Sequence, residues 1–170
     1  MSVEEHKRNA EGYVTCAVIT ISDTRNVEND KSGKLMKDLL IGNGHQVEYY
    51  KIIKDDRDEI INSIHEALEN SNIKAILLNG GTGIAKRDVT IETVTNLFEK
   101  EIIGFGELFR MLSYTVDIGP AAMLSRATAG IYRNRVIFST PGSTGAVRLA
   151  MEKLIVPELN HVVREIEKDL

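Results

Sequence analysis

Three glycines within four residues follow an apolar run, and this junction constrains the fold more than any other part of the chain. The run Ala75-Ile76-Leu77-Leu78 has the composition of a buried strand, and Asn79 leads from it into Gly80-Gly81-Thr82-Gly83. Glycines at a strand end let backbone N–H groups approach an anion, and the next helix adds partial positive charge at its N-terminus. Open α/β sheets bind ligands at the carboxyl ends of their strands. The junction therefore predicts a ligand-binding turn.

The residues that follow the glycines make this signal more specific. Many glycine-rich turns only close a tight connection, and the spacing here matches neither a Walker A loop nor a dinucleotide-binding fingerprint. Lys86, Arg87 and Asp88 come next, before a helix expected to begin near Thr90. Asp88 is expected to lie beside an anion held by the turn, where it could hold Mg²⁺, although it could also cap that helix or pair with Arg87.

Strand and helix patterns alternate along the chain, which predicts an α/β domain with a mainly parallel sheet. A short polar turn at Arg133-Asn134 joins two apolar runs, so one antiparallel strand is expected to extend the sheet. Pro157 is expected to separate the last two helices. The expected strands are 14–22, 46–53, 74–79, 128–132 and 135–139. The expected helices are 33–41, 57–69, 91–98, 107–114, 145–156 and 158–170.

The length and composition fit one globular domain. With 170 residues, 42% of them hydrophobic, the chain can bury a single core, and we expect a flexible segment at 1–11 followed by one domain at 12–170. A polar N-terminus and the lack of a long apolar run argue against a signal peptide or membrane span, and the single Cys16 suits a reducing cytoplasm. The net charge of −4 does not favour nucleic-acid binding.

Three further strand ends carry polar or glycine-containing turns. Ser22-Asp23-Thr24 follows the first strand, Asp55-Asp56 the second, and Thr140-Pro141-Gly142-Ser143 the last. Asp56 also fits a helix N-cap, with Glu59 three residues later, so a capping role and a ligand role are both open. Because these turns fall at one edge of a parallel sheet, we expect them to converge.

Two other features bear on metals and partners. The four histidines show no metal-ligand spacing, which argues against a zinc site. The middle of the chain is rich in aromatic residues and methionine, which favours a homo-oligomeric interface, although ordinary core packing would also use them. The residues concerned are Phe105, Phe109, Met111, Leu112, Tyr114 and Met123.

These motifs together resemble the MoaB/MogA family of molybdenum cofactor biosynthesis proteins, which is related to the G domain of gephyrin. The resemblance covers about residues 12–165. The matching motifs, in family order, are Ile21-Ser22-Asp23-Thr24, Asp30-Lys31-Ser32-Gly33, Asp55-Asp56, Gly80-Gly81-Thr82-Gly83, Arg87-Asp88-Val89-Thr90, Gly104-Phe105-Gly106-Glu107, Ser125-Arg126-Ala127, Ala129-Gly130 and Pro141-Gly142-Ser143.

The resemblance implies a three-layer α/β/α sandwich that binds molybdopterin. Active members of the family transfer AMP from Mg-ATP to the molybdopterin phosphate and release pyrophosphate. By the same resemblance Asp56 and Asp88 would be catalytic, and Asp88 would hold Mg²⁺. The residues expected to bind substrate and phosphate are Gly80, Gly81, Thr82, Gly83, Arg87, Ser22, Asp23, Ser139, Pro141, Gly142 and Ser143. Expected partners are further copies of the chain, as a trimer or hexamer, and the molybdate-insertion protein of the same pathway.

One motif departs from the pattern of many active relatives. They have Pro-Gly-Ser-Pro or Pro-Gly-Asn-Pro where this chain has Pro141-Gly142-Ser143-Thr144-Gly145. This variant resembles a branch whose members are not all catalytic. A non-catalytic molybdopterin-binding or carrier protein is therefore the alternative to an adenylyltransferase. A competence-damage type pyrophosphatase would be expected to show Gly-Gly-Leu-Gly at the glycine turn.

Overall fold

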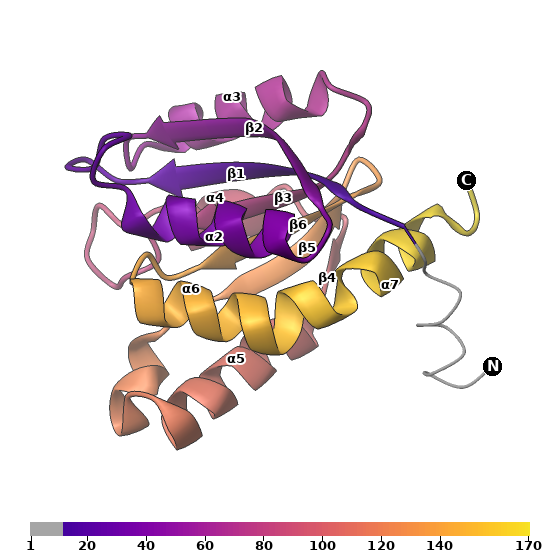
Figure 1. Cartoon of the computed structure of the whole chain (residues 1–170). Coiled ribbons are helices and arrows are strands. Elements are labelled where there is room, and N and C mark those ends of the chain that lie inside the picture. The colour runs from indigo at the N-terminus through magenta and orange to yellow at the C-terminus, as the bar shows by residue number, and fades with distance from the viewer. Residues whose placement is uncertain (1–11) are drawn as a thin grey trace.

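The computed structural model describes residues 12–170, so the predicted flexible segment at 1–11 lies outside the described residues. A six-stranded sheet in the order β2-β1-β3-β6-β5-β4 forms the middle layer (Figure 1). Its strands are β1 (Thr15–Ile21), β2 (Gln46–Ile53), β3 (Ile73–Asn79), β4 (Lys100–Glu101), β5 (Thr128–Tyr132) and β6 (Arg135–Thr140). Only β5 runs against the others, since β4 and β6 both pair with it in antiparallel fashion. The predicted α/β sheet with one antiparallel strand is confirmed.

Helices cover both faces of the sheet (Figure 1). They are α2 (Lys31–Gly42), α3 (Arg57–Leu68), α4 (Thr90–Thr95), α5 (Ile103–Val116), α6 (Thr144–Ala150) and α7 (Val156–Glu167), with a 3-10 helix η1 (Gly119–Leu124) and a π-helical turn η2 (Met151–Ile155). None of the helices in residues 12–170 is long and apolar enough to cross a bilayer.

Alternation along the central strands produces the two cores. In β1, Cys16 and Val18 point into the core shared with α2, α5, α6 and α7, whereas Ala17 and Ile19 point into the core shared with α3. Side chains on a strand point alternately to opposite faces, so a strand covered on both faces reads as a continuous apolar run. The burial of β1 and β3 therefore explains why the sequence shows these strands so clearly.

The end of the chain differs from the prediction. Pro157 was expected to separate two helices, but α6, η2 and α7 form one continuous helix that contains a π turn. The N–H of Val156 donates to the carbonyl of Met151, five residues back, and Pro157 lies at the start of α7. A proline in the first turn needs no N–H, and the wider turn just before it explains why the helix continues.

The start of one other helix was predicted wrongly, and two short elements were not predicted. The helix predicted at 107–114 begins at Ile103 and includes Gly104 and Gly106. A Cβ at Gly106 would lie 2.6 Å from the carbonyl oxygen of Ala127, so close packing requires glycine inside this helix. The strand β4 and the helix η1 were not predicted, because a two-residue strand carries no periodic signal.

Candidate functional site

Four turns meet at the carboxyl edge of the sheet, as predicted. The register pairs Ile21 with Ile53 across β1 and β2, and Asn79 with Thr140 across β3 and β6, so these four strands end together. The turns that follow β1, β3 and β6 border a cleft of about 430 Å³, whereas the Asp55-Asp56 turn after β2 contributes no residue to its lining. Its walls are Ile21, Ser22, Thr24, Arg25, Gly80, Gly81, Thr82, Gly83, Asp88, Leu124, Ser125, Pro141 and Gly142. The strand order reverses between β1 and β3, and this is where α/β sheets open a ligand crevice.

The three glycine positions of the turn have no room for a Cβ. Gly80 and Gly81 have φ values of 101° and 66°, which other residues rarely adopt. A Cβ on Gly80 would collide with the carbonyl oxygen of Ile21, and one on Gly81 would lie 2.8 Å from Asp55 Oδ1. A Cβ on Gly83 would lie 2.6 Å from Asp88 Oδ2. The glycines therefore let the backbone pass between β1 and the acidic side chains.

Arg126 holds the same turn from outside. Its Nε donates to the carbonyl of Thr82 over 2.9 Å, and its Nη2 donates to that of Gly83 over 2.7 Å. Glu92, on α4, forms an ion pair with the same guanidinium, and this contact lowers the pKa of Glu92. Arg126 thus ties the turn to α4 and fixes the direction of two carbonyl groups. Arg126 belongs to the motif Ser125-Arg126-Ala127, but its local sequence predicts no contact with the glycine turn.

Acidic side chains gather on one side of the turn. Asp88 lines the cleft, and its Oδ2 accepts the N–H of Ala85 over 3.1 Å. Asp55 lies against Gly81 and accepts the N–H of Val89 over 3.4 Å. The N–H of Asp55 donates to Asp23 Oδ1 over 3.3 Å. Burial, followed by the neighbouring charges of Asp88 and Asp23, raises the pKa of Asp55. Like charges drawn together in this way are typical of a site that receives a cation.

Asp56 has different partners from those of its neighbour Asp55. It is the N-cap of α3, where its Oδ1 accepts the N–H of Glu59 over 3.0 Å. Glu59 in turn accepts the N–H of Lys54 over 3.0 Å. Neither Asp55 nor Asp56 is among the residues that line the cleft, but the side chain of Asp56 makes the hydrogen bond of a helix cap, whereas that of Asp55 lies against Gly81. Of the two adjacent carboxylates, Asp55 is the one that lies against the glycine turn.

The other predicted residues differ in their exposure and in their contacts. Arg87 forms an ion pair with Asp23, and its side chain is 68% exposed. Ser143 accepts the N–H of Ala146 as the N-cap of α6. Ser139 is fully buried in β6, and no described residue is a hydrogen-bond partner of its hydroxyl. The structure thus brings the two glycine turns, Ser22 and Asp88 together around the cleft, whereas Ser139 is buried within β6 and does not line it.

The acidic side of the turn suits a hydrated divalent cation that is shared with a ligand. Among residues 12–170, no group of three or more metal-ligating side chains is arranged to hold a metal alone. Mg²⁺ is usually bound by one or two carboxylates together with phosphate oxygens and water. The Oγ1 of Thr90 is buried beside Gly81 without a described hydrogen-bond partner, and Asp55 lies on the same side of that glycine. The residues present therefore fit Mg²⁺ that arrives with a phosphate ligand.

Comparisons with known proteins identify the family of this chain. A family model described as a probable molybdopterin binding domain matches residues 17–161. Molybdenum cofactor biosynthesis protein B of Bacillus subtilis (strain 168) is 60% identical over 169 residues, which is 99% of both chains. The protein of the same name from Bacillus anthracis is 55% identical over 168 residues, again 99% of both chains.

Solved structures show the same similarity. A crystal structure of molybdenum cofactor biosynthesis protein B has a TM-score of 0.90 and 54% identity to this chain, and the match covers 92% of this chain and 98% of the other. The tungsten cofactor synthesizing protein MoaB from Pyrococcus furiosus has a TM-score of 0.82 and 38% identity, with the same coverage. The chain therefore belongs to the MoaB/MogA family of molybdenum cofactor biosynthesis proteins, with a molybdopterin-binding domain over most of its length.

Proposed function

We propose that this protein adenylylates molybdopterin with Mg-ATP and releases pyrophosphate. The observation that carries the proposal is the arrangement of charge and backbone at one cleft: Asp88 lines the cleft together with the glycine turn, and Asp55 lies against Gly81 of that turn. In the reaction, an oxygen of the molybdopterin phosphate attacks the α-phosphorus of ATP. A phosphoanhydride bond forms, and the bond to the pyrophosphate leaving group breaks.

In this proposal the glycine turn binds phosphate oxygens. Residues 80–83 follow the carboxyl end of β3; the N–H of Gly80 donates to the carbonyl of Thr140, so the N–H groups of residues 81–83 and the Thr82 hydroxyl are the groups that can donate to an anion. Ser22, Pro141 and Gly142 complete the walls of the cleft. Phosphoryl transfer depends mainly on positioning and charge neutralisation, so a rigid turn held by other residues is suited to it.

The carboxylates would hold the metal. We assign this role to Asp88, as the sequence predicts, and to Asp55 in place of Asp56, because Asp55 lies against Gly81 whereas Asp56 caps α3. Mg²⁺, when bound, neutralises charge on the phosphates of the nucleotide. Asp23 would support Asp55 through its backbone N–H and would keep Arg87 nearby.

One observation favours the alternative of a non-catalytic molybdopterin-binding protein. In the variant turn, the Ser143 hydroxyl is engaged as the cap of α6, and it accepts the N–H of Ala146 over 3.2 Å. Because the Ser143 hydroxyl oxygen already accepts this N–H, the hydroxyl is less free to reorient toward a phosphate during a reaction. Binding of molybdopterin without transfer would support this alternative.

The deciding experiment is anaerobic incubation of the protein with molybdopterin, ATP and Mg²⁺, followed by detection of the AMP-linked pterin. The matched variant is Asp88→Asn, assayed across a Mg²⁺ titration together with direct molybdopterin binding. We expect transfer to collapse while pterin affinity changes little. Full activity with an unchanged Mg²⁺ dependence would contradict the role of Asp88, and no product from the unmodified chain would contradict the transferase.

We also propose that the chain forms trimers or pairs of trimers. Apolar side chains of α5, η1 and the link between them are exposed in the single chain, and Met123 is 80% exposed. Contact with further copies of the chain would remove this surface from water. Its members are Ile103, Leu108, Met111, Tyr114, Val116, Ile118, Met123 and Leu124. Light scattering at micromolar concentration should give a multiple of the 18.9 kDa chain mass, and a monomer mass would contradict the assembly. The molybdate-insertion protein remains the expected downstream partner.

A further inference from the structure

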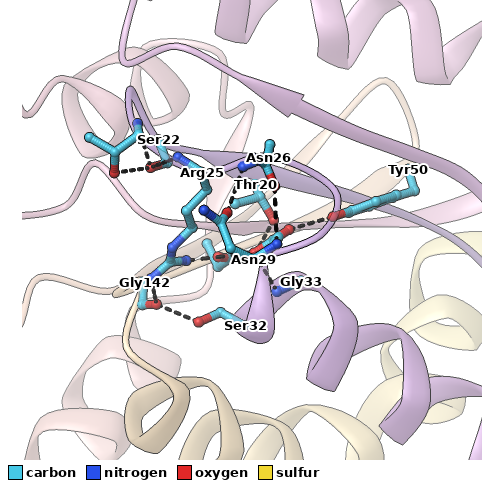
Figure 2. Close-up of polar contacts among 12 residues, drawn as sticks. Thr20, Ser22, Arg25, Asn26, Asn29, Ser32, Gly33, Tyr50 and Gly142 are labelled. Carbon is cyan, nitrogen blue, oxygen red and sulfur yellow. Dashed lines mark hydrogen bonds and ion pairs between the residues drawn. The ribbon is translucent and has the colours of Figure 1, made fainter.

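The loop between β1 and α2 places an arginine in the wall of the cleft. Arg25 lines the cleft together with Ser22 and Thr24, and its side chain is 29% exposed. Its own N–H donates to the Ser22 hydroxyl over 3.2 Å, so the start of the loop is fixed to the end of β1. Figure 2 shows its guanidinium reaching across to the Pro141-Gly142 turn.

A buried carboxylate holds this guanidinium. Asp30 has a side chain that is 0% exposed, and its Oδ1 lies 3.7 Å from Arg25 Nη1. The same Oδ1 accepts the N–H of Gly33, and Oδ2 accepts the hydroxyl of Tyr50 over 2.5 Å (Figure 2). Burial and the bond to Asp30 raise the pKa of Tyr50, so its hydroxyl stays a donor at neutral pH. A buried charge needs such partners, and here they fix Asp30 behind Arg25.

Arg25 also shapes the turn opposite. Its Nη2 donates to the carbonyl of Gly142 over 2.7 Å, and the Ser32 hydroxyl donates to the same oxygen over 2.6 Å (Figure 2). Two donors therefore occupy the carbonyl oxygen that would otherwise repel an anion near this wall. A guanidinium has five N–H donors, and the Gly142 carbonyl takes one of them while Asp30 faces Nη1. Donors remain for a ligand in the cleft.

The cleft is consequently polarised. Asp88 lines the cleft and accepts the N–H of Ala85, and Asp55 lies against Gly81 and accepts the N–H of Val89, both shortly before α4. Arg25 contacts Gly142, after the end of β6. Arg87, the arginine that the sequence suggests for phosphate, is paired with Asp23 and mostly exposed. An anion that carries Mg²⁺ would be stabilised on the acidic side, and an anion without metal would be stabilised beside Arg25.

We propose that Arg25 binds the metal-free phosphate of the pterin substrate, with Asp30 as the residue that positions it. This inference rests on the proposed function, in which two anionic substrates meet in one cleft and only the nucleotide brings Mg²⁺. The guanidinium fork matches a phosphate group in shape and charge. Arg25 thereby separates the acceptor phosphate from the donor phosphates, which lie on the side of Asp55 and Asp88.

The first test needs no pterin. Inorganic phosphate is titrated into the protein without Mg²⁺, and the side-chain ¹⁵N resonance of Arg25 is followed, assigned with Arg25→Lys. We expect a saturable shift at Arg25 and none at Arg148, which pairs with Glu152 on α6. An unmoved Arg25 resonance would overturn the inference. Because only phosphate is used, this outcome is independent of whether the protein transfers AMP.

The second test compares molybdopterin with its dephosphorylated form. The unmodified chain and the control Arg148→Gln should prefer the phosphorylated form by about tenfold or more, as one charge-assisted contact allows. Arg25→Gln should abolish the preference while its affinity for Mg-ATP and for the dephosphorylated form stays unchanged. Arg25→Lys should retain part of it.

The other results each decide a different question. A preserved preference in Arg25→Gln, or a loss confined to Mg-ATP binding, would overturn the assignment of Arg25. Equal loss of affinity for all three ligands, with a lowered melting temperature, would mean that Arg25 only stabilises the fold. This result would also overturn the assignment. If the unmodified chain binds neither form of molybdopterin, the proposed function fails. The phosphate titration alone then decides whether Arg25 binds an anion.

Discussion

The adjacent carboxylates Asp55 and Asp56 offer a controlled test of the site, because one substitution can be made at either position. Asp56→Asn should leave transfer nearly unchanged. Asparagine caps helices about as well as aspartate, so the bond to the N–H of Glu59 is kept, and the free energy of unfolding should change by about 0.5 kcal/mol or less. A residue that only caps α3 has no other effect on the cleft.

Asp55→Asn should act in the opposite way. The amide oxygen can still accept the N–H of Val89, and the change removes one of the charges crowded with Asp23 and Asp88, so the fold should be as stable or slightly more stable. The rate of transfer should fall by about a hundredfold or more, equivalent to about 2.7 kcal/mol, because a charge that holds metal against phosphate is lost. The Mg²⁺ concentration for half-maximal rate should rise by about tenfold.

The assay measures initial rates of AMP-linked pterin formation across a Mg²⁺ titration for both variants, with thermal melting as the control for folding. A hundredfold loss in Asp56→Asn with a normal Asp55→Asn would refute the reasoning and restore the assignment made from sequence. Loss in both variants with normal melting would mean that the α3 cap also serves the reaction.

Three further predictions concern the turn beside the cleft and the stability of the fold. Gly81→Ala should destabilise the protein by about 1–2 kcal/mol in a denaturant titration, since φ is 66° and Asp55 is close, whereas Gly104→Ala, which meets nothing within 4 Å, should stabilise α5 by about 0.5–1 kcal/mol. Arg126→Gln should weaken the binding of phosphate ligands by about tenfold with little change in Mg²⁺ dependence, because the glycine turn loses the group that orients its carbonyls. Unchanged affinity for phosphate ligands would show that Arg126 does not orient the turn. The Nδ1 of His45 accepts the N–H of Val14, and burial lowers the pKa of His45. Neutral His45 should therefore contribute about 1 kcal/mol to the free energy of unfolding above about pH 6.5, and this contribution should be lost as the pH falls through the lowered pKa. In His45→Phe, the free energy of unfolding should change less with pH in this range.

Local sequence patterns predicted the sheet well because its central strands are covered on both faces. The apolar runs of β1 and β3 end at glycine or polar turns, and the predicted bounds of β2 agree with the structure at both ends. The prediction was wrong where tertiary contacts decide the local conformation. Gly106 is helical because it packs against Ala127, and the helix continues past Pro157 because a π turn precedes it.

The site was only partly predictable for the same reason. The glycine turn and Asp88 were visible because their residue types are unusual after a buried strand. The sequence could not rank Asp55 against Asp56, since the two are adjacent and only the direction of each side chain distinguishes them. Arg25 had no local signal at all, because its role depends on Gly142, which lies 117 residues further along the chain.

Arg25 and Arg126 act on the two turns of the cleft in the same way. Arg126 holds the carbonyls of Thr82 and Gly83, and Arg25 holds that of Gly142. In a trans peptide the carbonyl and the following N–H point in opposite directions, so fixing a carbonyl also fixes the N–H of the next residue. The N–H groups of residues 83, 84 and 143 are thereby directed before any ligand arrives, and of these three residues Gly83 lines the cleft. A cleft whose donors are set in advance loses little conformational freedom on binding, and this is the condition under which backbone amides stabilise a reacting phosphate most effectively.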